Sequence, residues 1–348
     1  MLPAINIYYD KTRLLSHKMY FNMIIGNRGG GKTYGFKTWA INDYLKTGKQ
    51  FVWVRRYGTE IKEMRKKFYD DIAHLYPGKK LGIQGDTKRG TFFMDNQPMG
   101  YYIALSTSTS VKSTPYPKVD KIIFDEFLIM GNTYHYITDE VTLFMELIET
   151  IFRNREEDAK TNPDVISPRG VYLIGNNITI ANPYYLYFNV RPTSKFYVDR
   201  ERELLVEQYC NDKFVEIKKQ SRLGKLTAGT KYAEYAIENK PYLDNDKFIK
   251  SKPNNAKFTC AIVYKGKTYG FWIDYKNGDV YCNMQYDPSS YSIYSLTKED
   301  HTINTFLIKN TNSTYIKNIM WLFRNGCMFF ENTQIKGQVF EILAHFYK

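Results

Sequence analysis

The stretch Gly26-Asn27-Arg28-Gly29-Gly30-Gly31-Lys32-Thr33 constrains this chain more than any other. It matches the phosphate-binding loop G-x-x-x-x-G-K-[ST], with an apolar, β-prone run before it and a helical pattern after it. Glycines let backbone N–H groups face phosphate oxygens, and the following helix N-terminus adds positive potential. We predict that these residues bind a nucleoside triphosphate, with Lys32 on the β- and γ-phosphates and the Thr33 hydroxyl on Mg²⁺. A chance glycine-rich turn is the alternative, which the four matched positions and both flanks disfavour.

The second strong motif is the run Lys121-Ile-Ile-Phe-Asp125-Glu126, a buried-strand pattern that ends on two carboxylates. We predict that Asp125 holds Mg²⁺ and that Glu126 orients and deprotonates the attacking water. A carboxylate directly after the Asp favours hydrolysis over a kinase, where an acceptor hydroxyl replaces water. Two exposed acids at a strand end are the alternative, which a credible phosphate loop upstream makes weak.

Three more residues are candidates for the catalytic site. Arg153 lies in the last turn of a helical pattern over 140–155 and is a candidate arginine finger, although a basic helix C-terminus also complements the helix dipole. Arg155, two residues on, is an alternative finger. Asn176 ends another buried-strand pattern and is a candidate sensor of the γ-phosphate or the water; the alternative is a strand-end hydrogen bond. Lys112, in a Ser/Thr-rich loop, is the weakest candidate because such lysines are usually solvated.

Charge indicates an anionic partner. The 348 residues carry a formal net charge of +13, and the pI is near 9.2. Nucleic acid fits best because Lys and Arg gain affinity by releasing counterions from phosphates, although codon bias in an AT-rich genome is an alternative. The four cysteines lack metal-ligand spacing and are typical of reduced thiols in a cytoplasm. We expect no signal peptide, and no apolar run approaches the ~20 residues that span a bilayer.

The pattern of elements divides the chain into three parts. In 1–198, strands alternate with helices and polar motifs follow the strands, which is typical of an α/β sheet with ligands at that edge. Residues 199–247 are mostly helical in pattern and strongly charged, and we interpret them as a linker or lid. In 248–348, a three-stranded meander over 257–284 contains the hairpin signal Asn277-Gly278, and helical segments follow it. This last part is predicted to be an α+β domain.

Together these runs resemble the DNA-packaging ATPases of φ29-like podophages, the motors that drive the genome into the procapsid. The matching runs, in the family's order, are 25–33, 51–57, 122–127, 151–155, 181–189 and 271–274. The resemblance implies an ASCE-type ATPase domain with a mainly parallel, five-stranded core sheet and a C-terminal domain of RNase H-like fold. It also implies a homopentameric ring that uses ATP and Mg²⁺ to translocate double-stranded DNA. The ring would dock on the procapsid portal in the host cytoplasm, with no membrane, and a structural packaging RNA is a further candidate partner.

The resemblance also carries over to single residues. Lys32 with Thr33, and Asp125 with Glu126, match the family's Walker A and Walker B pairs. Arg153 matches its trans-acting finger, and Lys112 matches a basic residue thought to act across the subunit interface. The family has an arginine where this chain has Ile129. Any role of that arginine is therefore either absent from this chain or performed by another residue.

The C-terminal part lacks the pattern of a nuclease. In larger terminase relatives, this domain cuts DNA with acids that converge on two metals. Here the first meander strand, 258–264, contains no acid, and Asp274, Asp279 and Asp287 lie at strand ends and turns. We therefore predict a vestigial nuclease domain that binds nucleic acid or docks.

Two other functions remain open from sequence. One is a RecA-like helicase or another P-loop DNA-dependent ATPase, which the C-terminal half disfavours. The other is a nucleotide-gated assembly factor without turnover, which the adjacent Asp125 and Glu126 disfavour.

Overall fold

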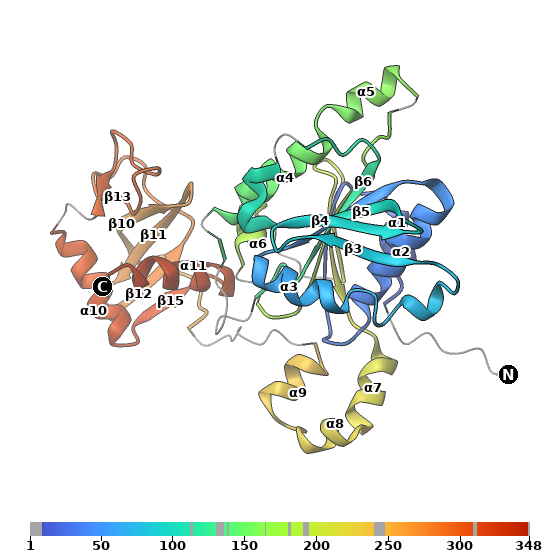
Figure 1. The fold of residues 1–348 in the computed structure, drawn as a ribbon. Helices are drawn as coiled ribbons and strands as arrows, with labels where there is room; N and C mark the ends of the chain where they lie inside the picture. The colour runs from blue at the N-terminus through green and yellow to red at the C-terminus, as the bar shows by residue number, and fades with distance from the viewer. Residues whose placement is uncertain are drawn as a thin grey trace. The chain divides into compact units, whose positions relative to one another are not determined.

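The computed structural model describes residues 9–111, 114–129, 136–137, 139–163, 165–179, 182–190, 195–239, 248–308 and 312–346. Contacts divide the chain into two compact units (Figure 1). The first unit comprises residues 1–178 and 190–242, and the second comprises residues 179–189 and 243–348. Each unit is built on one β-sheet.

The first unit contains a nine-stranded sheet of order β3-β4-β5-β2-β6-β7-β1-β9-β8. Every pairing from β5 to β9 in this order is parallel, and the outer pairings are antiparallel. The predicted α/β class with a mainly parallel sheet is therefore confirmed. The strands are β1 (Phe21–Gly26), β2 (Gln50–Arg55), β3 (Leu81–Gly85), β4 (Arg89–Met94), β5 (Gln97–Ala104), β6 (Val119–Asp125), β7 (Gly170–Asn176), β8 (Phe196–Asp199) and β9 (Leu204–Tyr209).

Helices cover both faces of this sheet, which is why β1, β2, β6 and β7 are buried along nearly their whole length. On one face, Phe36 and Ile61 join a core with Trp53. On the other face, Phe144 packs against Phe124. The helices are α1 (Thr12–Ser16), α2 (Lys32–Thr47), α3 (Gly58–Lys67), α4 (Glu140–Phe152), α5 (Arg155–Thr161), α7 (Asp212–Gln220), α8 (Arg222–Leu226) and α9 (Lys231–Ala236), with 3-10 turns η1 (Ala73–Leu75) and η2 (Leu105–Val111).

We expected residues 199–247 to be mostly helical, but the first part of this segment forms a strand. Residues 204–209 form β9, which pairs in parallel with β1 inside the first sheet. Leu204, Leu205 and Val206 are buried in the sheet. The sequence did not reveal this strand because a short apolar run is compatible with either a strand or a helix. Helices α7 to α9 follow as expected, and they belong to the first unit. The three-part division at 198 and 247 stays a prediction.

The second unit contains a six-stranded sheet of order β14-β13-β10-β11-β12-β15. The meander predicted over 257–284 is present, and its hairpin turns place Gly266 and Gly278 at φ of 68° and 71°. Helices α10 and α11 contribute to the core over this sheet. The elements are α6 (Pro183–Tyr187), β10 (Lys257–Tyr264), β11 (Lys267–Asp274), β12 (Asp279–Asn283), β13 (Ile293–Ser295), β14 (Phe306–Leu307), α10 (Thr314–Arg324), β15 (Met328–Phe330) and α11 (Thr333–Ala344).

The sequence shows no apolar run long enough to span a membrane, and the helices can be compared with that expectation. Across the described part of the chain, every helix is too short or too polar to traverse a bilayer.

Candidate active site

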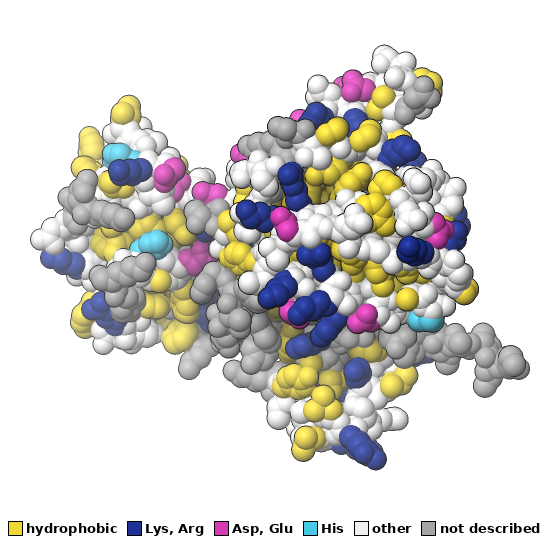
Figure 2. Space-filling view, in the orientation of Figure 1, with side chains coloured by type: hydrophobic (Ala, Val, Ile, Leu, Met, Phe, Trp, Pro, Cys, Tyr) yellow, Lys and Arg dark blue, Asp and Glu magenta, His cyan; other side chains and the backbone are white. Residues whose placement is uncertain are grey.

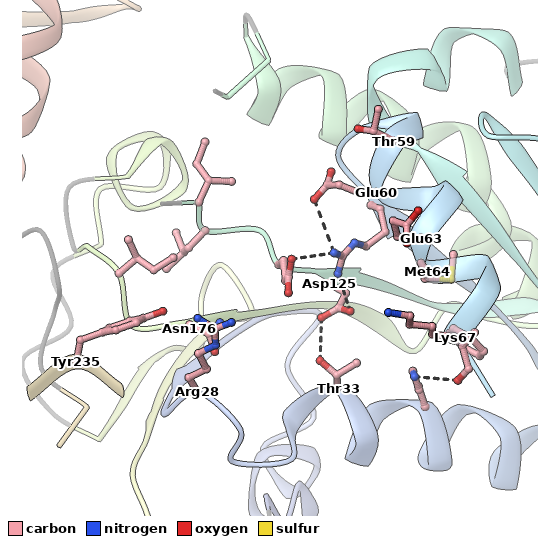
Figure 3. Close-up of a pocket in the computed structure, with 17 residues that line it drawn as sticks. Arg28, Thr33, Thr59, Glu60, Glu63, Met64, Lys67, Asp125, Asn176 and Tyr235 are labelled. Atoms are coloured by element: carbon pink, nitrogen blue, oxygen red, sulfur yellow. Dashed lines mark hydrogen bonds and ion pairs between the residues drawn. The ribbon is translucent and has the colours of Figure 1, made fainter. Parts of the chain in front are cut away.

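The predicted motifs meet at one edge of the first sheet. β1 leads into the phosphate-binding loop, β6 ends at Asp125, and β7 ends at Asn176. Parallel pairing of β7 with both β1 and β6 brings these strand ends together. They line a cavity of about 520 Å³, into which Arg28, Thr33, Asp125 and Asn176 point (Figure 3).

The loop conformation requires glycine at several positions. Gly29 and Gly31 have φ of 76° and 81°, in the left-handed region. At Gly26, a Cβ would lie only 2.4 Å from the carbonyl oxygen of Tyr209. This distance is too short for any side chain to fit there. The loop therefore wraps tightly, as close backbone approach to phosphate demands.

Lys32 lies inside the loop. Its Nζ donates to the carbonyl oxygens of Gly26 at 2.9 Å and Asn27 at 2.8 Å, and it lies 3.4 Å from Asn176 Oδ1. Burial lowers the pKa of Lys32 to about 7, and the charge of Asp125 opposes this shift. A phosphate bound in the loop would favour the charged ammonium.

Thr33 and Asp125 provide two adjacent oxygen ligands. Thr33 Oγ1 donates to Asp125 Oδ1 at 3.0 Å, across the gap between α2 and β6. A hydroxyl and a carboxylate suit Mg²⁺, which prefers oxygen ligands and keeps several waters. Burial raises the pKa of Asp125, whereas the charge of Arg55 lowers it.

Arg55 is a site residue to which the sequence analysis gave no role. From the end of β2, its Nη1 lies 2.9 Å from Asp125 Oδ2, and its Nη2 lies 2.8 Å from Glu126 Oε2. Glu60 on α3 is a third, longer partner at 3.7 Å. The signal in the sequence was the position of Arg55 at the end of a buried strand, the edge where the other motifs lie.

The turn that carries Glu126 is held by Arg56. Glu126 has φ of 60°, which is unusual for a residue with a side chain. Arg56, fully buried, donates to the carbonyl oxygens of Glu126 at 3.2 Å and Phe127 at 2.6 Å, and it pairs with Glu140 at 2.7 Å. The Glu126 side chain is about half exposed and lines the cavity. This turn therefore presents a carboxylate beside the phosphate loop.

The remaining predicted residues fall into three groups. Asn176, the candidate sensor, lines the cavity, and so does Ile129. Lys112 lies outside the described residues. Arg153 is exposed at the end of α4 and is not among the described residues that line the cavity of its own chain.

The structure separates Arg153 from Arg155. Arg153 caps α4, and its Nε donates to the Thr150 carbonyl oxygen at 3.2 Å. Arg155 is only 9% exposed. Its guanidinium donates to backbone carbonyl oxygens of residues 117, 119, 151, 152 and 166. Arg155 thus holds the interior together, and Arg153 is the arginine that faces solvent.

Comparison with known proteins decides the family. The model of the podovirus DNA encapsidation protein (Gp16) family matches residues 4–346. The chain belongs to this family. The DNA packaging protein of Bacillus phage phi29 is 32% identical over 338 residues, which cover 97% of each chain. That of Bacillus phage B103 is 32% identical over 330 residues, which cover 94% of this chain and 98% of the relative.

Solved structures agree with the family assignment. The bacteriophage Phi-29 viral genome packaging motor assembly contains a chain with 32% identity and a TM-score of 0.76, covering 97% of this chain and 99% of that one. The crystal structure of the N-terminal domain of the phi29 DNA packaging ATPase shows 33% identity and a TM-score of 0.50, covering 59% and 97%. The resemblance seen in the motifs is confirmed.

Proposed function

We propose that this protein is the ATP-hydrolysing subunit of a motor that translocates double-stranded viral DNA into the procapsid. The observation that carries the proposal is the placement of Asp125 and Glu126 opposite the phosphate loop at one sheet edge. Membership of the encapsidation family supports the DNA substrate, since its phi29 relatives are described as DNA packaging proteins.

The site residues divide the work of hydrolysis. The loop N–H groups and Lys32 would bind the phosphates, and Thr33 and Asp125 would hold Mg²⁺, which would neutralise charge on the β- and γ-phosphates. Glu126 takes a proton from water as the water oxygen bonds to the γ-phosphorus. The bond from that phosphorus to the bridging oxygen breaks, which leaves ADP and phosphate. Asn176 orients the water or the γ-phosphate.

The proposal includes a ring. Arg153 faces solvent at the end of α4, which suits a finger that reaches a neighbour's γ-phosphate. We propose a homopentamer on the procapsid portal in the host cytoplasm, where a structural RNA is a further candidate partner. Lys112 would act at the same subunit interface.

The second unit is proposed to be a non-catalytic, RNase H-like domain. Asp274 is 1% exposed. Its carboxylate accepts hydrogen bonds from Asn255 Nδ2 at 2.9 Å, Asn277 Nδ2 at 2.7 Å and the Lys276 backbone N–H at 3.0 Å. Among the described residues no cluster of three or more His, Cys, Asp or Glu side chains suits a metal. These facts support a structural carboxylate that organises a turn.

Contact with DNA is expected to be electrostatic. In the space-filling view, the segment from α7 to α9 carries basic and hydrophobic side chains on its surface (Figure 2). Basic residues over 213–225, and the chain after Phe188, are our candidates for contact with the duplex. Binding should weaken steeply with salt and show no strong sequence preference, since a packaging motor must accept every sequence.

The decisive experiment measures phosphate release with procapsids and DNA, added separately and together. We expect the rate to rise most when both are present, and Glu126→Gln protein to remain inactive in the same mixture. A rate of phosphate release that stays the same when procapsids and DNA are added would overturn the packaging role. Strand separation of a duplex in the absence of procapsids would instead favour a helicase, and binding without any phosphate release would favour an assembly factor.

A further inference from the structure

Helix α7 lies against the phosphate-binding loop. The Phe214 ring is 3% exposed and faces Gly29: a Cβ on that glycine would lie 3.9 Å from Phe214 Cζ. The same Cβ would lie 4.0 Å from Lys218 Nζ. Because Gly29 has no side chain and a φ of 76°, the bare loop backbone meets α7 here. An ammonium group that is not part of the loop motif thus stands beside the loop.

Two contacts distinguish Lys218 from the lysine next to it. Phe214 and Lys218 lie one turn apart on the same face of α7, and the Lys218 Nζ is 5.5 Å from the ring centroid, within range of a cation–π contact. Lys219 pairs with Glu238 at 2.8 Å. Within the described ranges, Lys218 has no carboxylate partner, so its positive charge is not neutralised locally.

Side-chain amides attach the segment that contains α7 to the sheet edge where the phosphate-binding loop lies. Asn27 in the loop is 1% exposed, and its Nδ2 donates to the Ile237 carbonyl oxygen at 2.6 Å. Asn177, just after β7, donates to the Asn239 carbonyl oxygen at 2.5 Å. Asn239 Nδ2 in turn donates to the carbonyl oxygen of Tyr209, at the end of β9, at 3.0 Å. The segment from β9 to residue 239 is therefore held at both ends, which limits how far α7 can move from the loop.

We propose that Lys218 is a nucleotide-binding residue that contacts the phosphates shared by ADP and ATP. The inference rests on the proposed ATPase function. Asp125 and Glu126 mark the γ-phosphate end of the larger cavity. Gly29 lines a second cavity of about 480 Å³, which extends along the loop to Tyr34.

The chemistry suits an ammonium at this position. A lysine offers three donors to phosphate oxygens, and charge-assisted hydrogen bonds are roughly twice as strong as neutral ones. In the loop, Lys32 serves the β- and γ-phosphates. Lys218 adds a second positive charge from outside the motif, on the side where the loop meets α7. Nucleotide binding would also fasten α7 to the loop more firmly.

The test compares Lys218→Ala with Lys219→Ala in the full chain. Dissociation constants are measured for a fluorescent ADP and for a fluorescent non-hydrolysable ATP analogue, both with Mg²⁺. We expect Lys218→Ala to weaken both by about 10- to 100-fold, as for the loss of a charged hydrogen bond, and Lys219→Ala to leave both unchanged. Lys218→Arg should retain most of the affinity.

Four outcomes overturn the inference. Equal affinities of the two alanine variants would show that Lys218 makes no contact with nucleotide. Weaker ATP binding with unchanged ADP binding would move the contact to the γ-phosphate. Weaker binding of duplex DNA with unchanged nucleotide binding would assign Lys218 to the DNA surface. If the parental chain binds neither nucleotide, the proposed ATPase function fails together with the inference. The first three outcomes overturn only the role of Lys218.

Discussion

Arg55 joins the two carboxylates of the candidate catalytic pair: its guanidinium lies 2.9 Å from Asp125 and 2.8 Å from Glu126. The arrangement follows from topology, because β2 and β6 are adjacent parallel strands and both end at the same edge. A planar guanidinium can contact two carboxylates at once, which a lysine cannot do with the same geometry. Glu126, the proposed base, is thus contacted by a guanidinium from a neighbouring strand.

The first prediction concerns Glu126. Glu126→Gln should bind ATP normally, because the loop and Asp125 are unchanged, whereas hydrolysis should fall by at least ~10² through loss of the base. Lys32→Ala should instead weaken nucleotide binding itself. Phosphate release and a titration with a fluorescent ATP analogue separate the two effects. Turnover of the Glu126→Gln protein at the parental rate would show that another group is the base.

The second prediction concerns Arg55. Its removal leaves Asp125 buried beside Glu126 without a guanidinium, so Arg55→Ala should lower the free energy of unfolding by about 3 kcal/mol. The kcat should fall as well, because Glu126 loses its orienting partner. Lys62→Ala, an exposed residue on α3, is the matched control and should change neither quantity. Urea unfolding and steady-state kinetics provide the measurements, and parental values for both in Arg55→Ala would contradict the prediction.

The third prediction concerns a buried ion-pair network at the start of β6. Lys121 is fully buried between Asp43 at 2.7 Å and Asp120 at 2.5 Å, and Arg169 pairs with both acids at 3.1 Å. Breaking such a network leaves uncompensated buried charge, so Lys121→Met should lower the unfolding free energy by ~3–5 kcal/mol.

The exposed Lys118→Ala is the control for this network and should lie within ~0.5 kcal/mol of the parental chain. Equal urea midpoints for Lys121→Met and the parental protein would mean that the network contributes nothing to stability.

The fourth prediction concerns nuclease activity. Since the Asp274 carboxylate is buried and accepts three hydrogen bonds within its turn, we expect no cutting of plasmid DNA with Mn²⁺ or Mg²⁺. Asp274→Ala should lower the stability of the second unit and leave the gel pattern unchanged. Cutting by the parental protein that disappears in Asp274→Ala would demonstrate an intact metal site.

Sequence patterns predicted those parts of the molecule that local chemistry determines. The loop glycines, the strand that ends at Asp125 and the Asn277-Gly278 hairpin each follow from nearest-neighbour rules, and the structure contains all three. Arg55 was missed because its partners are 70 and 71 residues away and meet it only when β2 lies beside β6. Lys121 was missed for a similar reason. A lysine near the start of a strand is usually solvated, and here the distant Asp43 on α2, together with Asp120, compensates its buried charge.

The structure also distinguishes two arginines whose roles the sequence left open. Arg153 and Arg155 lie two residues apart in one basic motif, and nothing local distinguishes them. Arg155 points inward and satisfies five backbone carbonyl oxygens, whereas Arg153 adopts φ of 47° after the helix and stays exposed. The exposed arginine is therefore the better candidate for a finger.

The last prediction is that neighbouring subunits share catalysis through Arg153. The apolar face of α4 is buried at Phe144, Ile151 and Phe152, so the helix is a rigid support for the guanidinium at its end. A finger in a neighbour's site stabilises the charge of the transition state and contributes ~10³ or more in rate. A residue that only complements the helix dipole contributes a fraction of a kcal/mol, about 0.3–1. Arg153→Ala should therefore abolish ATPase activity in assembled motors without reducing stability.

Mixing separates action on a neighbour from action within one chain. Arg153→Ala and Lys32→Ala subunits should each be inactive alone, and rings that contain both should recover part of the ATPase activity. Recovery arises where the intact phosphate loop of an Arg153→Ala subunit meets the intact finger of a Lys32→Ala subunit. Arg155→Ala is the control: it should unfold more easily, since five carbonyl oxygens lose their donor. Normal hydrolysis by Arg153→Ala rings would exclude the finger role. Two inactive variants that stay inactive when mixed would place the action of Arg153 within its own subunit.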